Sequence, residues 1–132
     1  MALNVEVVTP TASAFSGEVE DIRIPGWLGE FDVLPGHDRL IALGRGGLLT
    51  LVDKGVERKF VVGRGFAEAG PERVTVLVDS CVAVEDTDLQ SGAAELDQAE
   101  AALFQGEADS AEWLAAEEKA ELARGKLKAL GR

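Results

Sequence analysis

Residues 24–52 read IPGWLGEFDVLPGHDRLIALGRGGLLTLV, a stretch in which short apolar segments are separated by turn signals. Phe31 and Val33 alternate with Glu30 and Asp32, as in a strand that buries one face. One Pro-Gly pair precedes this segment and another follows it, and both favour tight turns. The stretch ends in an apolar run that only one threonine interrupts, so we expect this run to be buried on both faces.

The same pattern extends over residues 1–86, which contain all four prolines of the chain. Apolar and polar residues alternate upstream at residues 3–7, and β-branched residues are enriched downstream at residues 74–78. Asp21 interrupts the alternation that begins at Val19, which a β-bulge would absorb. The expected strands lie at residues 3–7, 19–24, 30–33, 48–52, 60–62, 74–78 and 81–84. About seven to ten short strands with this spacing predict an antiparallel sandwich or barrel.

The chain changes character at Thr87, after which it contains no proline and is rich in alanine. Thr87 with Gln90, and Asp109 with Glu112, have the capping-box spacing that marks the start of a helix. Gly106 lies between these two signals and is expected to end the first helix. Two helices with a short connection predict an antiparallel hairpin.

Alanine dominates the apolar faces of the expected hairpin. These faces consist of Leu89, Ala93, Leu96 and Leu103 in the first helix and of Trp113, Ala116, Ala120, Ala123, Leu127 and Leu130 in the second. A buried alanine removes much less apolar area from water than a leucine does, and isolated helices of this length are weak in water. The hairpin is therefore expected to be marginally stable by itself, and the sequence leaves open whether it stays docked or undocks.

The charges of the hairpin are segregated along the sequence. Residues 87–118 carry nine acids and no base, whereas residues 119–132 carry five bases and one acid, Glu121. Bases near the C-terminus of a helix complement its dipole, which explains part of this pattern. The alternative is that the basic tip meets an acidic surface of a partner.

The composition disfavours several classes of function. A formal net charge of −11 argues against nucleic acid and anionic lipid as partners, because both are bound mainly through Lys and Arg. No apolar run approaches the roughly 20 residues of a membrane helix, and we expect neither a signal peptide nor a transit peptide. Cys81 is the only cysteine, so it forms no internal disulfide and fits a reducing, cytoplasmic compartment.

The residues that common enzyme chemistry requires are missing from the sequence. His37 is the only histidine and there is one cysteine, which excludes a zinc site built on Cys and His. The chain contains neither a GxSxG nor an HExxH motif. Residues 44–47 and 63–65 are glycine-rich, but they lack the context of a phosphate-binding loop and are interpreted as turns or bulges. We therefore expect no catalytic residue, no metal and no cofactor.

Several segments form an ordered set that is specific to one family. In residues 24–49 a turn with two glycines is followed by a short strand that ends in LPGH and by an apolar stretch that closes on GGL. Residues 3–17 (LNVEVVTPTASAFSG) and 19–22 precede this region, and residues 63–66 and 74–79 (VTVLVD) follow it. In this order the segments closely resemble the epsilon subunits of bacterial F-type ATP synthases, and the resemblance covers the whole chain.

The resemblance implies a β-sandwich of about ten short antiparallel strands in residues 1–86, followed by a regulatory helical hairpin in residues 87–132. The sandwich of such a subunit packs on the gamma subunit and rests on the c-ring, as a non-catalytic part of the rotor of a proton-translocating synthase. The hairpin folds against the sandwich or extends along gamma to the catalytic alpha/beta head, where it inhibits ATP hydrolysis. The subunit is peripheral, on the cytoplasmic face of the bacterial inner membrane.

The resemblance also assigns roles to five residues. Glu30 and His37 match family positions on loops at the end of the sandwich that faces the c-ring. Glu30 is expected to pair with a basic loop of the c-ring, and His37 to pack and form hydrogen bonds there. Arg124, Lys126 and Lys128 form the basic tip, which is expected to face acidic parts of the catalytic subunits when the hairpin is extended.

Some members of this family bind ATP on the folded hairpin through an (I/L)-D-x-x-R-A motif. The aligned run here keeps Asp88, but Ser91 stands at the arginine position, and an alternative alignment places Glu100 there. The first helix has no cation to offset the charge of a phosphate, so we expect no ATP site of this type. The remaining alternative for the chain is a free-standing β-sandwich adaptor that binds a partner helix.

Overall fold

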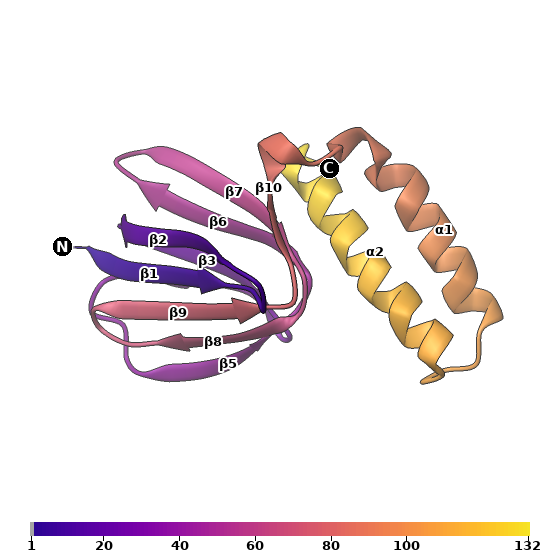
Figure 1. Cartoon of the computed structure of the whole chain (residues 1–132), viewed down its shortest axis with the longest axis horizontal. Helices are drawn as coiled ribbons and strands as arrows, with labels where there is room; N and C mark the ends of the chain where they lie inside the picture. Colours follow the sequence, from indigo (N-terminus) through magenta and orange to yellow (C-terminus); the bar gives the residue numbers. More distant parts are fainter. Residues whose placement is uncertain (1) are drawn as a thin grey trace.

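The predicted sandwich is present in the computed structural model, which describes residues 2–132 (Figure 1). Ten strands form in these residues, as expected for this fold. They are β1 (Leu3–Val8), β2 (Ser13–Val19), β3 (Asp21–Gly26), β4 (Gly29–Val33), β5 (Leu40–Gly44), β6 (Gly47–Asp53), β7 (Val56–Val62), β8 (Gly65–Ala69), β9 (Arg73–Val78) and β10 (Cys81–Ala83). The strands β2, β5 and β8 are absent from the predicted set, and in β5 and β8 apolar residues on the exposed faces hide the alternation.

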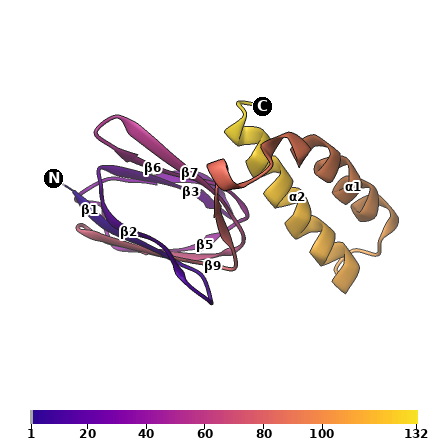
Figure 2. The same ribbon diagram turned by 45° about the horizontal axis from the view of Figure 1, so that its top comes forward.

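The strands follow the order β10-β7-β6-β3-β5-β8-β9-β1-β2, with β4 paired to β3. The strand β3 joins two layers, because its first half pairs with β6 and its last residue, Gly26, pairs with Gly44 of β5. Figure 2 shows β6 and β7 in one layer and β1, β5 and β9 in the other. One pair differs from the expected antiparallel arrangement, since β1 and β9 run parallel. These two strands are far apart in the sequence, so no hairpin fixes their relative direction.

Alternate residues of the strands meet between the two layers and form the core. The core comprises Leu3, Val5, Val7, Val19, Ile22, Ile24, Val33, Leu49, Leu51, Phe60, Val62, Ala67, Ala69, Val74, Val76 and Val78. The predicted bulge at Asp21 is wrong, because β2 ends at Val19 and β3 begins at Asp21. The break in the alternation therefore marks the boundary between two strands.

Two helices follow the sandwich, and their starts are displaced from the predicted ones. They are α1 (Gly92–Gln105) and α2 (Ala111–Ala129), after 3₁₀ turns at Val84–Asp86 and Leu89–Ser91. Asp88, and not Thr87, caps the second 3₁₀ turn by accepting a backbone N–H at 3.1 Å. Ser110 caps α2, since its Oγ accepts a hydrogen bond from the Trp113 backbone N–H at 3.2 Å. Asp109, the predicted cap, has a φ of 65° and lies outside the helix. The end of α1 at Gly106 is confirmed.

The helix α2 packs on β6 and β7, and α1 packs on α2 on the side away from the sandwich (Figure 1). Leu48 of β6 and its partner Val61 of β7 are buried although they do not belong to the sandwich core, because α2 packs on these two strands. The apolar run of β6 is thus buried on both faces, as predicted. No helix within residues 2–132 is long and apolar enough to cross a bilayer.

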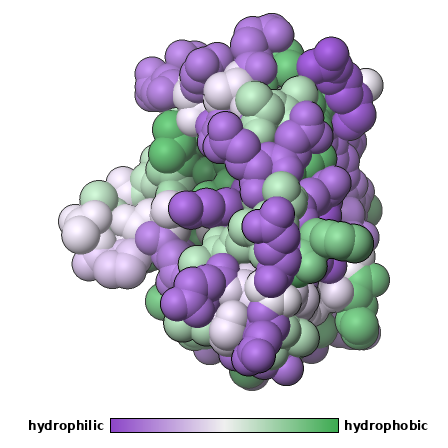
Figure 3. All heavy atoms as spheres, turned by 90° about the vertical axis from the view of Figure 1, so that its right-hand side faces the viewer, coloured by the Kyte–Doolittle hydropathy of each residue, from purple (hydrophilic) through white to green (hydrophobic). Residues whose placement is uncertain are grey.

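The alanine seam of the hairpin is confirmed in α2 and only partly in α1. Ala116, Ala120 and Ala123 are buried in α2. In α1, Gly92 and Ala99 are buried, whereas Ala93 is exposed although it lies within the helix, because the buried stripe runs through Gly92 instead. Seen from the hairpin side, hydrophilic residues separate the apolar patches of the surface (Figure 3).

Candidate functional interfaces

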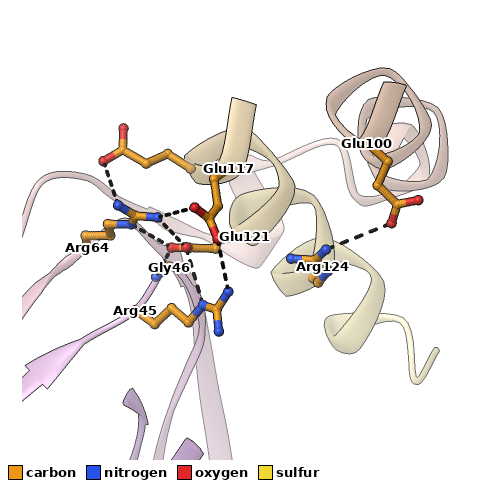
Figure 4. Close-up of polar contacts among 8 residues, drawn as sticks. Arg45, Gly46, Arg64, Glu100, Glu117, Glu121 and Arg124 are labelled. Carbon is orange, nitrogen blue, oxygen red and sulfur yellow. Dashed lines mark hydrogen bonds and ion pairs between the residues drawn. The ribbon is translucent and has the colours of Figure 1, made fainter. Parts of the chain in front are cut away.

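Glu121 on α2 is a charged residue with only 2% of its surface exposed. Its carboxylate faces the loops that join β5 to β6 and β7 to β8 (Figure 4). Oε1 accepts hydrogen bonds from the Gly46 N–H at 2.8 Å and from Arg64 Nε at 3.1 Å, and Oε2 accepts one from Arg64 Nη2 at 2.7 Å. Arg45 Nε lies 3.3 Å from Oε2. One carboxylate of the hairpin thus binds two arginines and a backbone amide of the sandwich, with bidentate geometry toward Arg64.

Two neighbouring acids of α2 extend this network toward solvent. Glu117 lies 3.8 Å from Arg45 and 3.9 Å from Arg64, and Glu118 lies 3.9 Å from Arg64. Burial alone would raise the pKa of Glu121, but the Arg64 hydrogen bonds, the Gly46 N–H and the charges of both arginines outweigh it and lower this pKa. The hydrogen bond with Glu121 also raises the pKa of Arg64. The network therefore holds Glu121 in its ionised form.

The lowered pKa of Glu121 predicts how docking depends on pH. The docked hairpin lowers the pKa of Glu121 below its ordinary value of 4.5, so the ionised carboxylate stabilises docking fully at pH values above 4.5. This stabilisation is lost as the pH falls from 4.5 through the lower pKa of the docked state. We expect hydrogen exchange of the α2 amides, corrected for its intrinsic pH dependence, to accelerate in that range. The Glu121→Gln variant serves as the control and should show a weaker pH dependence. The same dependence in both proteins would contradict this assignment.

Two glycines allow α2 to approach β6 closely. A Cβ atom on Gly125 would lie 2.9 Å from the carbonyl carbon of Gly47, 3.0 Å from its oxygen and 3.1 Å from its Cα. A Cβ atom on Gly46 would lie 2.9 Å from the Cβ of Glu121. The backbone of β6 cannot yield as a flexible side chain would, so glycine at position 125 sets the distance between helix and sheet.

A second candidate interface lies on the outer face of β5, β8 and β9. Leu43, Phe66 and Leu77 stand opposite one another on these three adjacent strands. Together with the β3–β4 turn they form what we call the apolar face, whose members are Trp27, Leu28, Ile41, Leu43, Phe66 and Leu77. The exposed fractions of these residues range from 36% to 105%. A groove of about 510 Å³ runs along one part of this face, between the turn and β5. Contiguous exposed apolar residues of this kind mark a binding surface.

The sandwich matches a known protein family over almost its whole length. Residues 2–84 match the family model "ATP synthase, Delta/Epsilon chain, beta-sandwich domain". The chain belongs to this family.

Its relatives in the family include bacterial proteins named "ATP synthase epsilon chain". That of Rhodopseudomonas palustris (strain BisB5) is 45% identical over 89 residues, which cover 67% of this chain and 66% of the relative. That of Afipia carboxidovorans is 39% identical over 98 residues, covering 74% of this chain and 72% of the relative. The first relative is thus matched over slightly less than two thirds of its length.

A solved structure shows the same fold over nearly the whole chain. A chain of the Euglena gracilis mitochondrial ATP synthase, solved as an OSCP/F1/c-ring assembly, superposes with a TM-score of 0.83 at 23% identity. The match covers 98% of this chain and 81% of that one. It therefore includes the hairpin, which lies beyond the residues that match the family model.

The two family positions assigned to the c-ring lie far apart in this structure. Glu30 lies at the start of β4, beside the β3–β4 turn and the hairpin, where its Oε2 accepts a hydrogen bond from Lys128 Nζ at 2.6 Å. His37 lies on the loop after β4, next to Gly36, whose N–H donates to the carbonyl of Pro71 in the β8–β9 turn. They stand at opposite ends of the sandwich, so the expectation that one end carries both is wrong.

The basic tip is in contact with acids of the same chain. Lys126 Nζ donates to Glu95 at 2.6 Å and to Ser91 at 3.2 Å, and Arg124 lies 3.9 Å from Glu100. The hydrogen bond between Lys128 and Glu30 completes the set. Surface pairs of this kind contribute between about 0 and 1 kcal/mol each, so they are readily exchanged for other acids. A role of the tip toward a partner stays a prediction.

Glu121, Arg45 and Arg64 were not singled out as site residues from the sequence. One signal was available, because Glu121 is the only acid among residues 119–132. Another was the position of each arginine between glycines, in 44–47 and 63–65, since both segments are indeed connections between strands. Neither signal predicts that Glu121 contacts the two arginines.

Proposed function

We propose that this chain is a non-catalytic rotor subunit of an F-type ATP synthase, in which the sandwich couples the gamma subunit to the c-ring. Membership of the ATP synthase delta/epsilon family supports this, as do bacterial relatives named epsilon chain. The Euglena chain that shares this fold was solved in an assembly with a c-ring, which points in the same direction. In a bacterium such a subunit would be peripheral, on the cytoplasmic face of the membrane that holds the proton-translocating part.

The apolar face is the observation that carries the proposal, and we assign it to the gamma subunit. A face with Trp27, Leu43 and Phe66 exposed is unfavourable for a free monomer and fits an obligate partner. The face excludes His37, which lies at the far end of the sandwich. Glu30, at the hairpin end, remains the proposed partner of a basic c-ring loop. In this role its ion pair with Lys128 would be replaced by one with a basic residue of that loop.

The gamma assignment predicts the effect of one charge on the apolar face. Leu43→Asp should weaken binding of the cognate gamma subunit at least about tenfold, because a central apolar contact is replaced by a buried charge. Val56→Asp is the matched control, since Val56 is 64% exposed and Leu43 is 61% exposed, but Val56 lies on the β6–β7 hairpin. Titration calorimetry with gamma distinguishes them, and thermal unfolding should be similar for both. Equal loss of affinity in the two variants would contradict the assignment.

We further propose that the hairpin inhibits ATP hydrolysis when it leaves the sandwich and enters the catalytic alpha/beta head. The alanine-rich seam and the weak surface ion pairs support this, because they add little to the free energy of docking beyond the Glu121 network. The test is ATP hydrolysis by a catalytic head that lacks this subunit, titrated with the full chain or with a version that ends at Asp86. We expect both to bind and only the full chain to inhibit. Failure of both to bind the cognate gamma subunit would favour the adaptor alternative.

A further inference from the structure

Arg45 and Arg64 connect the hairpin with the apolar face. Besides binding Glu121, the guanidinium carbon of each arginine lies 5.2 Å from the centroid of the Trp27 ring. Trp27 belongs to the β3–β4 turn, and its backbone N–H donates to the Leu43 carbonyl at 3.1 Å. Trp27 and Leu43 both line the groove of the apolar face. A continuous series of contacts therefore runs from α2 to this groove.

We propose that Trp27 responds to docking of the hairpin and transmits the docked state to the apolar face. With α2 docked, Glu121 holds both guanidinium groups beside the indole. When α2 leaves, the arginines lose Glu121 together with Glu117 and Glu118, and their mutual repulsion is no longer offset. The indole then loses its cation–π partners, and the turn that carries it becomes less ordered.

The β3–β4 turn depends on these contacts because packing holds it weakly. Leu28 is 105% exposed and Trp27 is 44% exposed, so burial does not fix Leu28 at all and restrains Trp27 only in part. Gly29 in the same turn has a φ of 121°, a conformation that glycine adopts freely. Segments with little buried surface have low local stability, and here the two arginines supply the missing restraint.

The consequence for partner binding rests on the proposed gamma assignment. A turn that is already ordered loses less conformational freedom on binding, so the docked form should bind gamma more tightly at the apolar face. By thermodynamic reciprocity, gamma bound at this face should favour the docked hairpin by the same factor. The hairpin would thereby influence gamma through the sandwich as well as by direct contact.

The first test uses tryptophan fluorescence of the full chain without any partner. The chain has two tryptophans, so Trp113→Phe leaves Trp27 as the only emitter. In this background Glu121→Gln should shift the Trp27 emission to longer wavelength and increase its quenching by acrylamide. Glu118→Gln, three residues earlier on α2, should change neither quantity, because the Glu118 side chain is 50% exposed and its carboxylate lies 3.9 Å from Arg64.

A second variant releases the hairpin while leaving every charge in place. Gly125→Val should push α2 off β6 by steric contact with Gly47, and Trp27 should respond as it does in Glu121→Gln. Hydrogen exchange of the α2 amides reports release in each variant, and the NMR signals of the sandwich report that it stays folded. If α2 is released in either variant while Trp27 emission and quenching stay as in the parent, the proposal is wrong.

A double-mutant cycle with the cognate gamma subunit tests the transmission step. Glu121→Gln should weaken gamma binding by about fivefold when Trp27 is present, and should have no effect when Trp27 is replaced by leucine. Equal weakening in both backgrounds would contradict the route through Trp27. If the parent chain does not bind gamma at all, the proposed function fails, whereas the fluorescence result still decides whether Trp27 responds to docking.

Discussion

Glu121→Ala is expected to weaken hairpin docking by about 2 kcal/mol, which lowers the docking equilibrium constant roughly thirtyfold. Breaking a fully buried ion pair costs about 3–5 kcal/mol, because the remaining charge is left without a partner. The loss here is smaller, since the side chains of Arg45 and Arg64 are 37% and 23% exposed and recover water. The expected result is a matching fall in the protection of the α2 amides in native-state hydrogen exchange.

A control variant distinguishes the buried position of Glu121 from the effect of its charge alone. Glu118→Ala removes the same charge from the same helix, but its side chain is 50% exposed and lies 3.9 Å from Arg64. It should change the protection of α2 by less than about 0.5 kcal/mol. If the two variants change protection equally, net charge and not the buried network holds α2 in place. The core strands of the sandwich should keep their protection in both.

Gly125→Val is expected to have the largest effect on docking, a loss of about 3 kcal/mol. The added side chain would meet the backbone of Gly47, whose carbonyl carbon lies 2.9 Å from the ideal Cβ position. Gly125→Ala should give about 1–2 kcal/mol in the same direction, although alanine favours an isolated helix by about 1 kcal/mol over glycine. A Gly125→Ala variant that docks more weakly although its helix propensity is higher would therefore identify the steric contact with Gly47 as the cause.

The matched control for Gly125→Val is Ala115→Val on an exposed part of α2. It introduces the same β-branched residue into the same helix and should lower helix propensity by less than about 1 kcal/mol without releasing α2. Docking can be followed by hydrogen exchange or by cross-linking between α2 and β6. A Gly125→Val protein in which α2 remains as protected as in the parent would show that β6 can move to accommodate the side chain.

The regular part of this structure was predictable because it depends on local periodicity. Alternation identifies strands such as β1 and β9, and the alanine seam identifies α2. The capping signal at Asp109 lies one residue from the observed cap of α2, Ser110, because both residue types can cap a helix. The signal at Thr87 lies five residues before α1, which begins at Gly92 after a 3₁₀ turn. The direction of β1 against β9 is a property of the whole sheet and no local pattern contains it.

The docking interface was not predictable because its members are distant in the sequence. Glu121 is 75 residues from Gly46 and 57 residues from Arg64, and only the packing of α2 on β6 brings them together. In a sequence, Glu121 is one more polar residue beside the alanine seam, and Arg64 is a base between two turn glycines. The exposed Ile41 and Leu43 of β5 obscured the alternation of that strand, and with it the apolar face to which they belong.

The parallel pairing of β1 with β9 also determines the order in which the chain can fold during synthesis. Val5 aligns with Val74, so the first strand has no partner on that side until most of the sandwich has left the ribosome. Contacts between such distant residues close slowly and leave an unpaired strand edge exposed meanwhile. The hairpin is synthesised after the sandwich and meets β6 and β7 when both are already available to it. A nascent chain stalled before β9 has left the ribosome should therefore be a target for chaperones, whereas one in which β10 has also left it should already be resistant to protease.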